Sequence, residues 1–200
     1  QMVPLGTNPD KYLAAVGSYV RNSFGNRGSI LTLEEVAKIR EATKARAAAW
    51  TQPELIAALP HPLSNRANWK ASASVEEAKA AAALDGKGNT AWSTKEPQRA
   101  GQWFQLELPQ EQTIMGVRME VPQRSKVAPR QVKVEVSNDG QSWNTVIAKA
   151  NGGTPLTELT FASTKAKFMR VTQLGNSNEP WSIHEIELIE PGSMFPLASK

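Results

Sequence analysis

Apolar and polar residues follow two different periods along this chain, and the period changes near residue 61. Before that point, apolar residues recur every three or four positions, which is typical of amphipathic helices. After it, apolar and polar residues alternate singly, as in residues 131–136, which is typical of strands with one buried face. The pattern therefore predicts an α-helical segment at residues 1–60 and a mostly β region after it.

Start signals predict three helices in the first region. Residues 8–10 (Asn-Pro-Asp) place a capping residue, a proline suited to the first helical position and an acid near the positive helix end. Thr32 with Glu35, and Thr51 with Glu54, have the spacing of capping boxes. These pairs predict a second helix and a short third helix.

The β region is expected to form one domain. Residues 61–65 are interpreted as a linker, because Pro62 prevents a helix from continuing. Residues 66–190 hold short alternating segments separated by turn signals such as Asn-Asp-Gly at 138–140, with no helical pattern between them. This arrangement predicts an antiparallel sandwich or barrel. Residues 191–200 are expected to form a C-terminal tail.

Composition narrows the function classes. Hydrophobic residues make up 40% and charged residues 21%, a globular balance, and no apolar run is long enough to span a bilayer. The chain opens in polar sequence without a basic-then-apolar leader, so we expect a mature or cut fragment. The net charge of +4 comes from cations interleaved with acids, which does not indicate nucleic acid binding. Cysteine is absent, which excludes thiol chemistry within these residues, and the two histidines lack metal-ligand spacing.

Six segments of the β region carry distinctive motifs. They include Trp-Lys-Ala-Ser-Ala-Ser at 69–74, Leu-Asp-Gly at 84–86 together with residues 90–94, and Trp-Ser-Ile-His-Glu-Ile-Glu-Leu at 181–188; the other three lie at 101–108, 136–143 and 167–171. Taken in order, they resemble the discoidin family, also called coagulation-factor type C domains, whose relatives include family-32 carbohydrate-binding modules. The resemblance covers roughly residues 66–190. It implies an eight-stranded antiparallel jelly-roll sandwich that binds ligands through loops at one end and is not a catalyst.

The resemblance also implies a calcium loop. Its oxygen ligands would come from Ala83, Asp85, Thr90 and Glu185. Lys87 departs from the family pattern, which often places an Asp or Asn ligand there. Two interpretations follow: calcium binds with Lys87 giving only its carbonyl oxygen, or Asp85 closes the loop without metal by accepting backbone amides. The retention of Asp85, Thr90 and Glu185 favours an ion.

Candidate ligand contacts are charged or amide side chains in predicted loops, with one tryptophan that follows an exposed loop. Sugars are bound by such hydrogen-bonding groups and by aromatic faces. The candidates are Arg99, Arg124, Lys126, Asn178 and Trp181. Three other tryptophans, at positions 92, 103 and 143, are expected in core or packing roles.

Residues 1–60 carry a second resemblance. Met-Val-Pro-Leu-Gly at 2–6, followed by Tyr-Leu-Ala-Ala-Val-Gly-Ser-Tyr-Val-Arg at 12–21, is similar to the end of a class I c-type cytochrome domain. The resemblance implies that Met2 is a haem axial ligand and that haem c is held by an upstream region, because this chain has no Cys-x-x-Cys-His. The alternative is an unrelated helical hairpin.

Together these resemblances predict a non-catalytic carbohydrate-binding module. It would tether a larger, haem-containing redox protein to a glycan or a cell-surface protein, in the periplasm or outside the cell. The alternative is the C-terminal part of an electron-transfer protein in which the sandwich is a docking or structural domain. No nucleophile, metal triad or acid pair indicates an enzyme.

Overall fold

The computed structural model describes residues 6–23, 30–46 and 48–192. The chain divides between residues 55 and 56 into two compact units, which are described separately. Met2, the predicted haem ligand, lies outside the described residues. None of the described helices has the length and hydropathy needed to cross a membrane.

The first unit contains helices α1 (Asp10–Asn22) and α2 (Leu33–Thr43). The predicted capping box of α2 is confirmed: the Thr32 amide donates to Glu35 at 2.7 Å, and the Glu35 amide donates to Thr32 Oγ1 at 3.2 Å. Arg40 links the two helices, because its Nε donates to Asp10 Oδ1 at 2.7 Å. Helix α1 has no side-chain cap of its own: Pro9 rather than the predicted Asn8 is at the N-cap position, and Asp10 in its first turn is held by Arg40 instead.

Helix α3 (Gln52–Ala57) begins at the second predicted cap. The Thr51 amide donates to Glu54 Oε2 at 2.7 Å, and Arg46 pairs with the same carboxylate at 2.7 Å. The hydrogen bond from Arg46, followed by those from Thr51, lowers the pKa of Glu54 to about 2.

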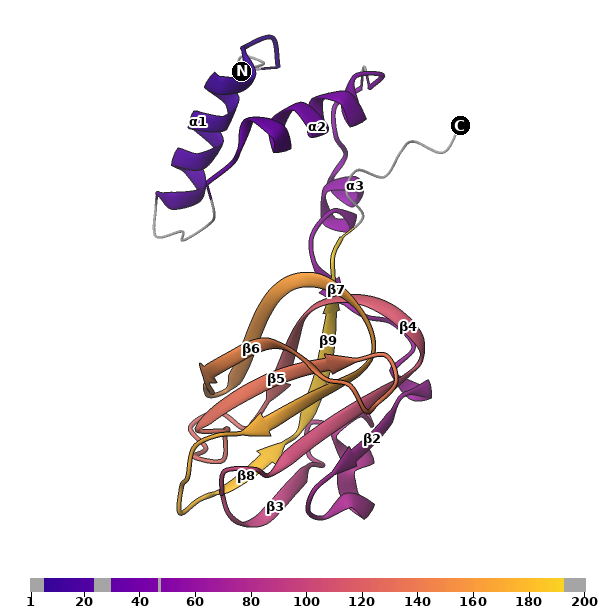
Figure 1. Ribbon diagram of the computed structural model, residues 1–200, viewed down its shortest axis with the longest axis vertical. Helices are drawn as coiled ribbons and strands as arrows, with labels where there is room; N and C mark the ends of the chain where they lie inside the picture. The colour runs from indigo at the N-terminus through magenta and orange to yellow at the C-terminus, as the bar shows by residue number, and fades with distance from the viewer. Residues whose placement is uncertain (1–5, 24–29, 47, 193–200) are drawn as a thin grey trace. The chain divides into compact units, whose positions relative to one another are not determined.

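The second unit is an antiparallel β sandwich, as predicted (Figure 1). Seven strands form one sheet in the order β1-β9-β4-β7-β5-β6 with β2 on β4, and β3 pairs with β8 separately. The described residues thus form nine strands, one more than expected, because two residues of the presumed linker pair with the last strand as β1. The strands are β1 (His61–Pro62), β2 (Lys70–Ala73), β3 (Trp92–Pro97), β4 (Trp103–Glu120), β5 (Gln131–Ser137), β6 (Asn144–Asn151), β7 (Leu156–Gln173), β8 (Pro180–Ile183) and β9 (Glu185–Glu190). Two short 3-10 helices, η1 (Arg66–Asn68) and η2 (Glu77–Ala83), precede β2 and β3.

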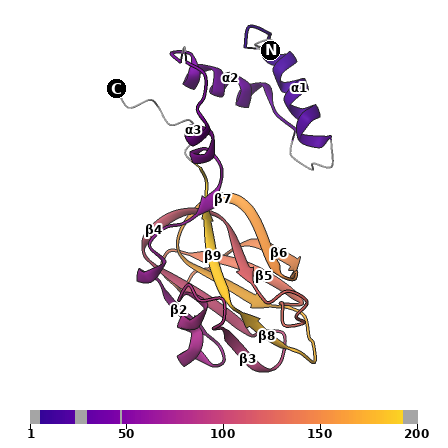
Figure 2. The ribbon, with the colours of Figure 1, turned by 180° about the vertical axis from the view of Figure 1, so that it is seen from behind.

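Strands β4 and β7 pair along nearly their full 18 residues (Figures 1 and 2). The long sheet folds over along this pair, so that one half of each strand lies in each layer of the sandwich. The first half of β4 also pairs with β2, and its second half pairs with β9. The register shifts between Glu107 and Gln112, and again between Ile114 and Gly116. At Gly116 a side chain would meet the Leu159 carbonyl oxygen at 2.9 Å, so only glycine fits this crowded bend.

The core lies between the two layers and centres on three aromatic rings. Trp92 is fully buried, 4.9 Å from Phe104 and 5.0 Å from Trp181, with the two indoles nearly perpendicular. Edge-to-face aromatic packing of this kind stabilises a core beyond the area that it buries. Trp69 also joins this core.

The other two predicted packing tryptophans lie elsewhere. Trp103 and Trp143 are half-buried and both stack on the Arg170 guanidinium, at 4.7 Å and 4.1 Å from the ring centroids. Gln105 accepts two hydrogen bonds from the same guanidinium. These rings therefore pack on a cation outside the core.

We expect Trp181→Ala to lower the free energy of unfolding by about 3–5 kcal/mol, because it removes a fully buried ring and leaves a cavity beside Trp92. Urea denaturation followed by circular dichroism measures this change. Leu174→Ala, at a side chain that is 36% exposed, is the control and should change stability by no more than about 0.5 kcal/mol. Similar losses for the two variants would contradict the packing described.

Candidate functional site

Three loops of the sandwich enclose a cavity of about 630 Å³. The loops follow β4, β6 and β7, so residues far apart in sequence meet there. The volume lies within the range of about 300–1,000 Å³ typical of small-ligand sites. The lining residues are Ser125, Lys126, Ala128, Pro129, Arg130, Asn151, Gly152, Gly153, Thr154, Ser177 and Glu179.

The buried amide of Gln98 fastens two of these loops together. Its Nε2 donates to the carbonyls of Ala128 (2.9 Å) and Pro180 (3.1 Å). Its Oε1 accepts from the Arg130 amide at 3.0 Å and from the buried side chain of Gln173. Both donors and both lone pairs of the amide are used, so the network is fully satisfied and fixes the loops rigidly.

The third loop is attached through two threonine hydroxyls, that of Thr154 in the loop and that of Thr157 in β7. Thr154 Oγ1 donates to the Ser125 carbonyl at 3.2 Å, and the Gly153 amide donates to Thr157 Oγ1 at 2.9 Å. Ser125 Oγ, in a residue of the cavity wall, is buried without a hydrogen-bond partner among the described residues.

The cavity is polar and carries more positive than negative charge. Lys126 and Arg130 are the two cations in the lining, and Glu179 is its only acid. Neither cation forms an ion pair within the described residues. None of the lining residues is aromatic. A ligand here would be held by hydrogen bonds and charge rather than by stacking on a ring.

The predicted ligand contacts divide into those at the cavity and those beside it. Lys126 lines the cavity. Arg124 is exposed at a tight turn, with φ of 64°, and Asn178 is exposed between two lining residues. Arg99 supports a wall, because its Nη1 donates to the Ser177 carbonyl at 3.3 Å.

The role predicted for Trp181 is wrong. Its side chain is fully buried against Trp92, so its ring has no face free for a sugar. The residues before it form a loop, as expected, but strand β8 begins at Pro180 and directs this tryptophan inward. Alternation within a four-residue strand was too short to reveal that orientation from sequence.

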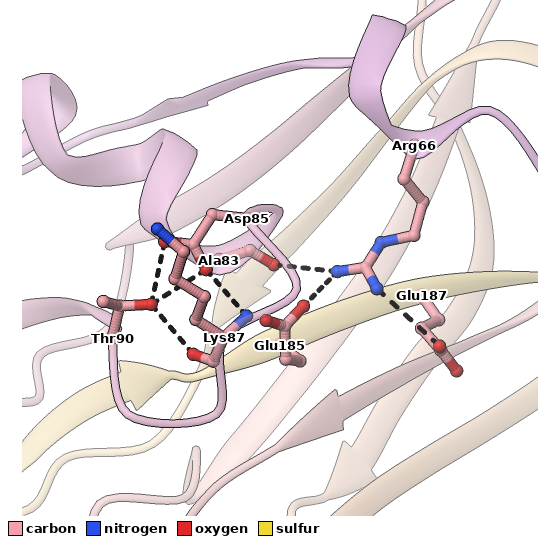
Figure 3. Close-up of polar contacts among 7 residues, drawn as sticks. All are labelled: Arg66, Ala83, Asp85, Lys87, Thr90, Glu185 and Glu187. Atoms are coloured by element: carbon pink, nitrogen blue, oxygen red, sulfur yellow. Dashed lines mark hydrogen bonds and ion pairs between the residues drawn. The ribbon is translucent and has the colours of Figure 1, made fainter.

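The predicted calcium ligands lie close together, at the loop between η2 and β3 (Figure 3). Asp85 Oδ1 accepts from the Lys87 amide at 2.9 Å and lies 2.8 Å from Thr90 Oγ1. The hydrogen bond from Thr90, then that from the Lys87 amide, lowers the pKa of Asp85. These contacts are the ones expected if Asp85 closes the loop itself, without a metal.

The other two predicted ligands contact Arg66, which extends from η1 toward the loop (Figure 3). Its Nη2 pairs with Glu185 Oε2 and lies 3.4 Å from the Ala83 carbonyl oxygen. Its Nη1 lies 3.8 Å from Glu187 Oε1. A guanidinium that already engages two of the four oxygen donors does not fit a calcium ion at the same point. Among the described residues, no three His, Asp or Glu side chains form a metal-binding group.

Two residues that organise these sites were not predicted for those roles. Gln98 follows strand β3 in a loop, where a polar side chain is usually exposed, yet it is fully buried. Arg66 pairs with a carboxylate 119 positions away, and no local motif marks such a pairing. A single sequence offers no signal for either contact, because both depend on which loops the sandwich brings together.

Comparisons with known proteins agree with the fold. The profile of the F5/8 type C domain matches residues 68–186, and residues 1–60 lie outside that match. No curated protein matches the chain.

Several solved structures are similar to the sandwich. The module CpGH89CBM32-5 from Clostridium perfringens, in complex with GalNAc-β-1,3-galactose, is 27% identical with a TM-score of 0.53, covering 62% of this chain and 96% of its own. Chitosan-binding module 1 of a chitosanase/glucanase from Paenibacillus sp. IK-5 is 28% identical with a TM-score of 0.52, covering 66% and 96%. The family 32 module of C. perfringens NanJ, in complex with galactose, is 20% identical with a TM-score of 0.55. The match covers 66% of this chain and 100% of the module, and it supports the fold alone.

The profile match extends over more than half of the chain, and its ends fall inside the sandwich built around Trp92 and Trp181. The chain belongs to the F5/8 type C domain family.

Proposed function

We propose that the sandwich is a non-catalytic carbohydrate-binding module and that the cavity between the three loops is its binding site. The observation that carries the proposal is the cavity itself: about 630 Å³, polar, and built on the rigid amide network of Gln98. The similar modules crystallised with GalNAc-β-1,3-galactose or named for chitosan support a sugar as the ligand.

The charges favour an acidic sugar. Lys126 and Arg130 offer donors that can pair with a carboxylate or sulfate, and Arg99 and Arg124 lie on the adjoining loop surfaces. Glu179 is the single acid in the lining. We therefore propose a uronic-acid or sulfated glycan as the preferred ligand class.

The number of carboxyl groups in the cavity lining argues against hydrolysis of a bound sugar. Glycoside hydrolysis usually needs two carboxyl groups that flank one bond, separated by about 5–10 Å. With Glu179 alone in the cavity lining, the site offers one carboxylate. Binding without cleavage is the function that this arrangement supports.

We further propose that the module tethers the rest of its parent protein, in the periplasm or outside the cell. A weak sugar site raises the local concentration of an attached domain near its target. Because residues 1–60 resemble the end of a cytochrome domain, we propose that the attached domain is a haem domain. The alternative is an electron-transfer protein in which the sandwich is a docking or structural domain. Haem staining of the full-length parent protein should give a positive band, and a negative band would remove the haem part of the proposal.

A binding experiment tests the site and its charge preference together. Calorimetry should show binding of a glucuronate-containing oligosaccharide, and Kd should rise about tenfold in Lys126→Ala or Arg130→Ala, because each loses one charge-assisted hydrogen bond. Lys79→Ala, at an exposed lysine of η2 outside the lining, should leave Kd unchanged.

Two failures of this experiment have different meanings. Equal binding of the acidic oligosaccharide and its neutral counterpart would contradict the charge preference alone. A lack of binding to either, extended to a glycan array, would contradict the proposed function.

The role of Gln98 can be tested without knowing the ligand. Gln98→Met leaves two carbonyls and one amide of the loops unpaired in a buried position, so we expect a loss of about 2–4 kcal/mol in the free energy of unfolding. Hydrogen exchange should become faster in residues 122–130 and 174–180. Gln141→Met, at an exposed side chain, is the matched control. Unchanged exchange in these loops would show that the amide does not hold them.

A further inference from the structure

Oxygen acceptors from two separate elements, β9 and η2, converge on one side chain of η1. Glu185 and Glu187 lie two positions apart on β9, and both carboxylates are within 4 Å of the Arg66 guanidinium. The Ala83 carbonyl at the end of η2 also accepts from it. Most of the Arg66 and Glu185 side chains are withdrawn from water, with 22% and 10% of their surfaces exposed.

We propose that the Arg66 guanidinium is the built-in cation of this site, and that it holds η1, η2 and β9 together in place of the calcium ion implied by the family resemblance. The positive charge is supplied by the chain itself, so the sandwich closes without a metal. This inference is independent of what the cavity binds.

The contacts of the four predicted ligands support this assignment. Calcium requires about six to eight oxygens at about 2.3–2.6 Å, including those of Glu185 and Ala83. Both residues already contact Nη2 of Arg66 (Figure 3). Asp85 and Thr90 are hydrogen-bonded to each other, and the Lys87 amide completes that loop. A calcium ion would have to displace the guanidinium, because two cations at this distance repel each other.

The unpaired atoms of the site belong to the same two residues. Arg66 Nε and Glu185 Oε1 are both buried and without partners among the described residues. Nε and Nη2 are the two donors of a side-on bidentate arginine–carboxylate pair. A small rotation of either head group would therefore satisfy both atoms with no metal and no added ligand.

Arginine suits this role better than lysine. Its guanidinium stays charged at any physiological pH, and its fork can engage a carboxylate and a carbonyl at once. A permanent internal cation makes the closed form independent of calcium concentration. We therefore expect the module to keep its stability in chelating or calcium-poor surroundings.

Thermal unfolding of the whole chain tests this inference. The melting temperature should be the same, within about 1 °C, in EGTA and in about 10 mM CaCl₂, a concentration that is roughly tenfold or more above the Kd of extracellular calcium modules. If calcium bound the folded form, that concentration would raise the melting temperature by several degrees. A saturable rise of this size in the unmodified protein would overturn the proposal.

Variants of Arg66 provide the second readout. Arg66→Gln leaves the buried Glu185 carboxylate unpaired, so we expect the melting temperature to fall by roughly 10 °C. Arg66→Lys keeps the charge without the fork and should lose less. The matched control is Arg118→Gln, at the more exposed Arg118–Glu158 pair on the same sandwich, which should lose about 3 °C or less. An equal loss for Arg66→Gln and Arg118→Gln would also overturn the proposal.

Discussion

The long pairing of β4 with β7 is the constraint on which the rest of this sandwich depends. These two strands run through both layers, so the other strands of the main sheet add to one or the other half of the same ladder. The register shifts between Glu107 and Gln112 and beside Gly116 interrupt the ladder and let it bend. Once the ladder is bent, the inward faces of its two halves enclose Trp92 and Trp181.

Two polar side chains, the buried Gln98 and the largely buried Arg66, fix the conformation of segments that the hydrophobic core does not specify. Apolar packing is non-directional, so it does not specify the conformation of a loop. Gln98 fixes two of the three loops that form the cavity, through an amide whose four hydrogen-bonding positions are all used. Arg66 likewise ties two 3-10 helices to the last strand. In both cases, one side chain that leaves water organises segments that the chain order keeps apart.

The sequence predicted the fold more fully than the site. Alternation in residues 131–136 and the cap at Thr32 are local signals, and the structure confirms both. The four predicted calcium ligands lie near one another (Figure 3), although in the structure Asp85 bonds to Thr90 while Ala83 and Glu185 both contact Arg66. The cation beside them was missed, since Arg66 stands outside any motif and its carboxylate partner is remote. Trp181 was misjudged because a tryptophan after an exposed loop looks the same in sequence whether its ring turns inward or outward.

The sequence by itself determined the secondary structure, the antiparallel class and the set of loops that carry polar side chains, because these depend on periodicity and on short capping and turn motifs. Only the tertiary structure decided which loops share a cavity, that Lys126 and Arg130 line it while Trp181 is buried in the core, and that Arg66 pairs with Glu185. The reason is physical. A burial pattern is a property of neighbours in sequence, whereas charge pairing and cavity shape arise between segments that meet only when the bent β4–β7 ladder brings them together.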